Sequence, residues 1–169
     1  MTVNAWLNSE LDRTNPILMI TFGILMTVAG IFVRAFVGSP YRTMLHLDIQ
    51  EIVPPVWLMT FLWTLSFFTV GCALGFILGY RIGGRDVEKY KGCLFFVLMS
   101  VMELCWYPTL FGAELVLISA LLSILILFLS IIVTFSFYQI SKFAGMIMLF
   151  HDIWLIYMLI LNCSVLFHC

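Results

Sequence analysis

Two ionisable side chains lie inside long apolar stretches of the sequence, and each stands three residues before a tryptophan. Glu103 precedes Trp106, and His151 precedes Trp154. In a helix, side chains three positions apart lie on the same face. Ionisable groups inside an apolar span are costly, and proteins usually keep them for a functional reason. The spacing therefore predicts two polar groups, each beside an indole ring, on surfaces that face the interior of the protein.

Glu103 and His151 fit more than one chemistry. A protonated Glu103 carboxyl would hydrogen-bond to a neighbouring helix, and a neutral His151 would bond to the backbone or to Glu103. Both could instead line a ligand pocket, where His151 could also be an axial ligand of a porphyrin iron, or exchange protons in a small carrier. Asp152 is expected to point nearly away from Trp154, toward a helix contact or an oligomer face. The sequence leaves these alternatives open.

A third tryptophan reaches the same depth in its span. Trp63 lies about 14 Å inside, at about 1.5 Å per residue, and Trp106 and Trp154 come to a comparable depth when counted from the same face. An indole N–H at that depth has no water and needs a partner or a ligand. The alternative is that the three rings only fill space between helices. The predicted pocket is lined by Trp63, Trp106, Trp154, Glu103, His151, Met158 and Leu161.

The composition indicates which elements hold these residues. Of 169 residues, 63% are hydrophobic and 10% are charged, so the chain has too little polar surface to cover a soluble core of its size. The apolar residues come in runs of roughly 20, enough for a helix to cross about 30 Å of hydrocarbon. The predicted fold is an all-α integral membrane bundle, a single domain of residues 1–169. Its five transmembrane helices are expected at 16–37, 54–79, 92–111, 115–137 and 143–167.

Other features narrow the function classes. A net charge of -1, with no run of basic residues, argues against nucleic-acid binding. The five cysteines are odd in number and include no CxxC pair, so we interpret them as small apolar residues and expect neither a disulfide framework nor a zinc site.

Prolines and glycines indicate how the helices begin and pack. Pro16 and Pro54 are expected in the first turn of their helices, and Trp57 is expected as an anchor at the membrane interface. Gly71, Gly75 and Gly79 form a ladder that lets another backbone approach closely. We favour packing inside the bundle for this ladder, and contact in a homodimer stays open.

Residues 54–73, PPVWLMTFLWTLSFFTVGCA, resemble the second helix of the TspO/MBR family, the translocator or tryptophan-rich sensory proteins. The family pattern of prolines, tryptophan and glycine agrees with the spacing of Pro55, Trp63 and Gly71. The stretches MELCWYPTLFG and YQISKFAGMIMLFHDIW resemble its third helix and the junction into its fifth. They match at Trp106, Phe111, Gly112, Tyr138, Gln139, Ser141, Ala144 and Trp154, and the family's Leu-Asn follows as Leu161 and Asn162. The resemblance spans roughly residues 40–167.

The sequence also departs from the family pattern. Glu103 stands where the family usually has Asn, Phe150 and His151 stand where it has Pro-Tyr, and Leu110 replaces a Phe. The stretch LNCSVLFHC lacks the Tyr and Arg that follow Leu-Asn in vertebrate members. This difference argues against sterol binding through that stretch, and such motifs are weak evidence even when intact.

The resemblance implies an internal pocket that binds hydrophobic planar ligands for transport or sensing. The implied ligands are tetrapyrroles such as protoporphyrin IX or haem and, in animal members, cholesterol and benzodiazepine-like drugs. No cofactor is required, and the long first loop would act as a lid. A flat ligand would stack on Trp63.

Two alternatives follow for activity. The first alternative is a membrane enzyme that degrades porphyrin. Bacterial members are reported to degrade protoporphyrin in light, and the tryptophans implicated there match Trp63 and Trp154. A small proton-coupled carrier that uses Glu103 and His151 is the other. The stretch YQIS is closer to the animal branch, which favours a multi-pass protein of the mitochondrial outer membrane.

Overall fold

The computed structural model describes residues 9–10, 12–38, 43, 54–81 and 86–168. Within these ranges, five helical segments are long and apolar enough to cross a membrane. The helices are α2 (Pro16–Val37), α4 (Val56–Gly79), α5 (Asp86–Tyr107) with the short π-helical turn η1 (Pro108–Gly112), α6 (Val116–Ile140) and α7 (Lys142–His168). The predicted all-α membrane bundle is confirmed.

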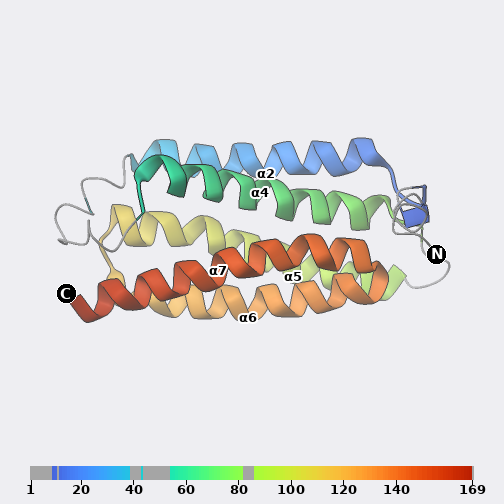
Figure 1. The fold of residues 1–169 in the computed structure, drawn as a ribbon. Helices are drawn as coiled ribbons and strands as arrows, with labels where there is room; N and C mark the ends of the chain where they lie inside the picture. Colours follow the sequence, from blue (N-terminus) through green and yellow to red (C-terminus); the bar gives the residue numbers. More distant parts are fainter. Residues whose placement is uncertain (1–8, 11, 39–42, 44–53, 82–85, 169) are drawn as a thin grey trace.

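The helices do not pack in the order of the sequence. α4 contacts α2 and also the distant α7, while α6 contacts both α7 and α5 (Figure 1). α2 begins and α7 ends at opposite ends of the bundle (Figure 1), as an odd number of crossings requires. This arrangement brings α4, α5 and α7, which carry Trp63, Trp106 and Trp154, around one interior.

Capping contacts fix where the first two long helices begin and end. Pro16 is the first residue of α2, as predicted, and the Asn15 side chain accepts a hydrogen bond from the Ile17 N–H at 3.0 Å. Pro54 lies before α4 and not in its first turn, because Pro55 is the N-cap. At the other end of α4, the Lys89 ammonium donates to the carbonyl of Leu78 at 2.7 Å. A cation there satisfies a free helix carbonyl and complements the helix dipole.

Three helices are longer than the predicted spans. α5 begins at Asp86 and not at residue 92, α6 continues to Ile140, and α7 begins at Lys142. Only Ser141 separates α6 from α7, and its N–H donates to the Phe137 carbonyl at 2.8 Å. Apolar runs reveal only the part of a helix that crosses hydrocarbon, whereas these helices continue into the interface, where polar side chains are solvated.

The glycine ladder of α4 packs inside the bundle. A Cβ atom at Gly71 would lie 2.3 Å from the Phe22 carbonyl oxygen, and one at Gly75 would lie 2.4 Å from the Leu18 carbonyl oxygen. Both contacts are with the backbone of α2, which cannot move away without separating the two helices. The packing interpretation of the ladder is therefore confirmed.

Trp57 and the cysteines also have clear positions. Trp57 lies in the first turn of α4 and is 70% exposed on the outside of the bundle, a position that suits an interfacial anchor. Cys72, Cys93, Cys105 and Cys163 are free thiols.

Candidate ligand-binding site

Three tryptophans from three helices meet in the interior. Trp63 of α4, Trp106 of α5 and Trp154 of α7 are 5%, 3% and 6% exposed. The rings of Trp63 and Trp106 stack with centroids 5.6 Å apart, and the Trp154 ring lies 5.4 Å from that of Tyr157. Tyr107, which sequence reasoning did not single out, lies 5.4 Å from Trp63. The indoles face the interior and not the lipid, as the spacing of Trp106 and Trp154 to Glu103 and His151 predicted.

A small cavity lies between these rings. Trp63, Trp106 and Trp154 line it together with Glu103 and with Ser123, Ile126, Leu155 and Met158, and its volume is about 10 Å³. This is the room that one water molecule needs, whereas pockets for drug-sized ligands have volumes of about 300 to 1,000 Å³. Five of the seven predicted residues, namely Trp63, Glu103, Trp106, Trp154 and Met158, line this cavity, but the rings close around a space that a tetrapyrrole does not fit without movement.

The polar atoms around this cavity lack partners. Within the described part of the chain, neither the three indole N–H groups nor the two carboxyl oxygens of Glu103 have a hydrogen bond. Buried polar groups in proteins are almost always hydrogen-bonded, because each orphan costs about 1 to 3 kcal/mol. Four such side chains therefore leave hydrogen-bonding capacity around one cavity that the described protein groups do not use.

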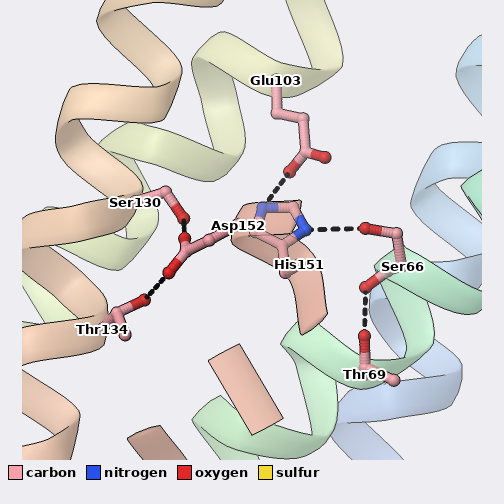
Figure 2. Close-up of polar contacts among 7 residues, drawn as sticks. All are labelled: Ser66, Thr69, Glu103, Ser130, Thr134, His151 and Asp152. Atoms are coloured by element: carbon pink, nitrogen blue, oxygen red, sulfur yellow. Dashed lines mark hydrogen bonds and ion pairs between the residues drawn. The ribbon is translucent and has the colours of Figure 1, made fainter. Parts of the chain in front are cut away.

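His151 lies beside Glu103 but is held from the other side. Its Nδ1 lies 2.7 Å from the Ser66 hydroxyl oxygen on α4, and its Nε2 lies 3.7 Å from Oε2 of Glu103 (Figure 2). The latter distance is too long for a hydrogen bond. Ser66 was not predicted as the partner of His151, because the sequence suggested only the backbone or Glu103. The ring is fully buried and links α4 to α7.

The geometry disfavours His151 as a ligand of haem iron. Ser66 occupies the Nδ1 side, and the Glu103 carboxyl lies 3.7 Å from Nε2. An iron atom bonded to Nε2 at about 2 Å, with a porphyrin ring around it, would need the space of that carboxyl. His151 and Leu161 are also not among the residues that line the described cavity, although Leu161 is buried at 3% exposure.

Asp152 has a structural position away from the cavity. The hydroxyls of Ser130 and Thr134 on α6 both donate to its carboxylate, the latter at 2.7 Å (Figure 2). The expected helix contact is confirmed. The sequence shows hydroxyl residues along this helix, but Ser119 and Ser123 have the same spacing of four as Ser130 and Thr134, so the spacing alone does not identify the partners of Asp152.

The long first loop, expected as a lid, lies almost wholly outside the described residues. Of that loop, Thr43 is described, and its hydroxyl donates to the Phe111 carbonyl at 3.0 Å.

Comparison with known proteins supports the resemblance seen in the sequence. The family model described as "TspO/MBR family" matches residues 18–168. The "Tryptophan-rich protein TspO" of Chlorobaculum tepidum is 30% identical over 114 residues, which cover 67% of this chain and 70% of that protein.

Proposed function

The chain belongs to the TspO/MBR family, and from this premise we propose that it binds a flat, lipid-soluble tetrapyrrole between Trp63, Trp106 and Trp154. The observation that carries the proposal is the set of buried polar groups without partners around one cavity, namely three indole N–H groups and the Glu103 carboxyl. Protoporphyrin IX offers a π-face for the indoles and two propionic acid groups as hydrogen-bond partners for these polar atoms. A sterol offers one hydroxyl and no π-face.

Binding in this form needs the cavity to open. The stacked Trp63 and Trp106 rings leave about 10 Å³ between the helices, so a planar ligand would have to separate or replace them. It would then regain the ring contacts that it breaks and satisfy N–H groups that have no partner. We propose that both gains together favour the ligand-bound state.

Titration of the purified protein with protoporphyrin IX, followed by tryptophan fluorescence quenching, tests the proposal. We expect Trp63→Ala to weaken binding about 30-fold, equivalent to about 2 kcal/mol, as for a buried aromatic residue at the centre of a site. Trp57→Ala is the matched control, because Trp57 is on the same helix but exposed, and its affinity should equal that of the wild type. Equal affinities for all three proteins, or saturable binding of cholesterol alone, would contradict the proposal.

A proton-coupled carrier is the second candidate, favoured by one observation. Glu103 and His151, two groups able to exchange a proton, lie 3.7 Å apart in the middle of the bundle. A carrier should move its substrate across proteoliposome membranes and stop doing so in Glu103→Gln. A binding protein should keep its protoporphyrin affinity within a few-fold in that variant.

Light-dependent degradation of the ligand would be an enzymatic activity in addition to binding. An enzyme must form a defined product from protoporphyrin faster than the free pigment does under the same light. If Trp154→Phe, which keeps a ring, abolished this excess rate without changing affinity, the protein would be an enzyme as well as a binder.

The protein is an integral multi-pass membrane protein. The relative from Chlorobaculum tepidum is bacterial, so the mitochondrial outer membrane expected from the YQIS stretch does not follow from membership of the family. Fractionation of source cells followed by immunoblotting tests that expectation.

A further inference from the structure

Trp154 separates two spaces. On one side is the inner cavity of about 10 Å³, which it lines with Trp63 and Glu103. On the other side is a groove of about 380 Å³ between α4 and α7, which it lines with Leu58 and Leu62. Trp154 thus forms a wall that the groove and the cavity share.

The groove suits an apolar molecule that carries polar groups. Its surface is almost entirely apolar, and Ile153, which also lines it, is 67% exposed on the outside of the bundle. In a membrane this outer surface faces lipid. Trp154 and Tyr157 line this groove, and neither the Trp154 Nε1 nor the Tyr157 hydroxyl, both buried, has a hydrogen-bond partner within the described residues. Buried polar groups without partners beside an apolar groove indicate a ligand that brings its own.

Neither space is sufficient alone. The cavity holds no more than a water molecule, and the groove is near the lower limit of about 300 to 1,000 Å³ for a drug-sized ligand. A change of the Trp154 rotamer would join them into one site that extends from the lipid to Trp63. The groove then supplies the volume that the closed cavity lacks.

The α4–α7 contact has fewer described restraints than the α2–α4 and α6–α7 contacts beside it. The α2–α4 contact is fixed by backbone approach at Gly71 and Gly75. The α6–α7 contact is fixed by hydrogen bonds from Ser130 and Thr134 to Asp152. Between α4 and α7, the described side-chain hydrogen bond is the single one between Ser66 and His151.

We propose that the tetrapyrrole enters this site sideways from the bilayer, through the groove between α4 and α7, with Trp154 as the gate. This inference rests on the proposed function. A tetrapyrrole dissolved in the bilayer docks on Leu58 and Leu62, displaces the Trp154 ring, and reaches the indole N–H of Trp63 and the Glu103 carboxyl. On this route the ligand does not enter from the aqueous phase.

A matched pair of variants tests the route. A second groove of about 470 Å³ lies between α6 and α7, lined by Phe135 and Leu149 among others, and none of its described lining residues borders the inner cavity. Leu62→Phe narrows the proposed entry, and Leu149→Phe makes the same change in the control groove. Proteoliposomes of each variant are mixed rapidly with vesicles that carry protoporphyrin IX, and the rate of tryptophan quenching is measured.

We expect Leu62→Phe to slow association at least tenfold and Leu149→Phe to leave it unchanged. Leu58→Phe is a second variant in the same groove, used in case Leu62→Phe does not fold. It should slow association in the same way. Trp154→Ala should accelerate association severalfold, because the wall is removed. At a fixed total amount of ligand, the wild-type rate should also fall as added lipid dilutes the ligand in the bilayer.

The outcomes separate the route from the function. Saturable quenching with equal rates in the wild type, Leu62→Phe and Leu58→Phe would overturn the entry route and leave the proposed function intact. Equal slowing by Leu62→Phe and Leu149→Phe would also overturn it. No saturable quenching in the wild type would overturn both.

Discussion

The polar residues on the two faces of α7 differ in whether they have hydrogen-bond partners. Toward α6, Asp152 accepts hydrogen bonds from Ser130 and Thr134, and Ser119 donates to Asn162 at 2.9 Å. Toward α4 and α5, His151 Nδ1 is bonded to Ser66, but His151 Nε2, the Trp154 indole N–H and the facing Glu103 carboxyl of α5 have no hydrogen-bond partner in the described part of the protein. The same helix therefore has one face with satisfied polar groups and one face on which the Ser66–His151 contact is the single described side-chain hydrogen bond.

This difference distinguishes polar groups that stabilise the fold from polar groups that are available to a ligand. A polar group in lipid that is satisfied by a neighbouring helix holds the two helices together. A polar group that is left unsatisfied reduces stability, and a protein gains from keeping it only if a ligand satisfies it later. Changes on the α6 face should therefore alter stability alone, whereas changes at the cavity should alter affinity and stability in opposite directions.

The largest effect is expected on the α6 face. The double change Ser130→Ala and Thr134→Val leaves the buried Asp152 carboxyl without its two donors. We expect the free energy of unfolding to fall by about 3 kcal/mol, because an unsatisfied buried group costs about 1 to 3 kcal/mol and a charged one more. Unfolding in mixtures of SDS and a mild detergent measures this change, and protoporphyrin affinity should stay the same.

Ser136→Ala is the control for this prediction. Ser136 is on the same helix, but its hydroxyl donates only to the Ile132 carbonyl within α6, at 2.8 Å. Its loss should change the free energy of unfolding by less than about 0.5 kcal/mol. A double variant as stable as Ser136→Ala would show that Asp152 does not depend on α6.

A smaller effect of opposite sign is expected at the cavity. Glu103→Met keeps the length of the side chain and removes two carboxyl oxygens that have no hydrogen bond. We expect the ligand-free protein to become more stable by about 1 to 2 kcal/mol, since hydrophobic replacement of buried polar groups is often stabilising. The affinity for protoporphyrin should fall at the same time.

Chemical unfolding with and without ligand measures both parts of the Glu103 prediction. Glu103→Gln, which keeps polar atoms at the same place, should not stabilise the ligand-free protein. A loss of stability in Glu103→Met would mean that the 3.7 Å contact with His151 stabilises the fold and that the comparison of the two faces is wrong at this residue.

The fold and the convergence of the tryptophans were predictable because they depend on local patterns. Apolar runs of membrane-crossing length gave the five helices, and the comparable depth of Trp63, Trp106 and Trp154 placed them in one layer. Asp152 was correctly directed away from Trp154 by helix periodicity alone. Each of these follows from one helix at a time.

What could not be predicted depends on how helices rotate against one another. The partner of His151 is Ser66, which lies 85 positions away in the sequence, and no pattern within α4 indicates this pairing. The closure of the cavity to about 10 Å³ likewise results from the stacking of Trp63 on Trp106, and spacing along a helix does not fix the rotamers of large rings.

The smallest predicted effect concerns that same pairing. Ser66→Ala removes the hydroxyl 2.7 Å from Nδ1 of His151, the one described side-chain hydrogen bond between α4 and α7. Hydrogen bonds between membrane helices contribute about 0.6 kcal/mol on average, so we expect the free energy of unfolding to fall by about that amount. Thr69→Val is the control, because the Thr69 hydroxyl donates to the Ser66 carbonyl within α4 at 2.9 Å and holds no second helix.

The informative readout for Ser66→Ala is the rate of ligand association. If α4 and α7 separate during entry, loss of their hydrogen bond lowers the barrier, and association should be about twofold to threefold faster than in Thr69→Val, which corresponds to about 0.6 kcal/mol. An unchanged rate with a lowered stability would place the Ser66–His151 pair with the satisfied contacts of the α6 face. His151 would then belong with the polar groups that stabilise the fold, and Glu103 would remain with the unsatisfied polar groups at the cavity.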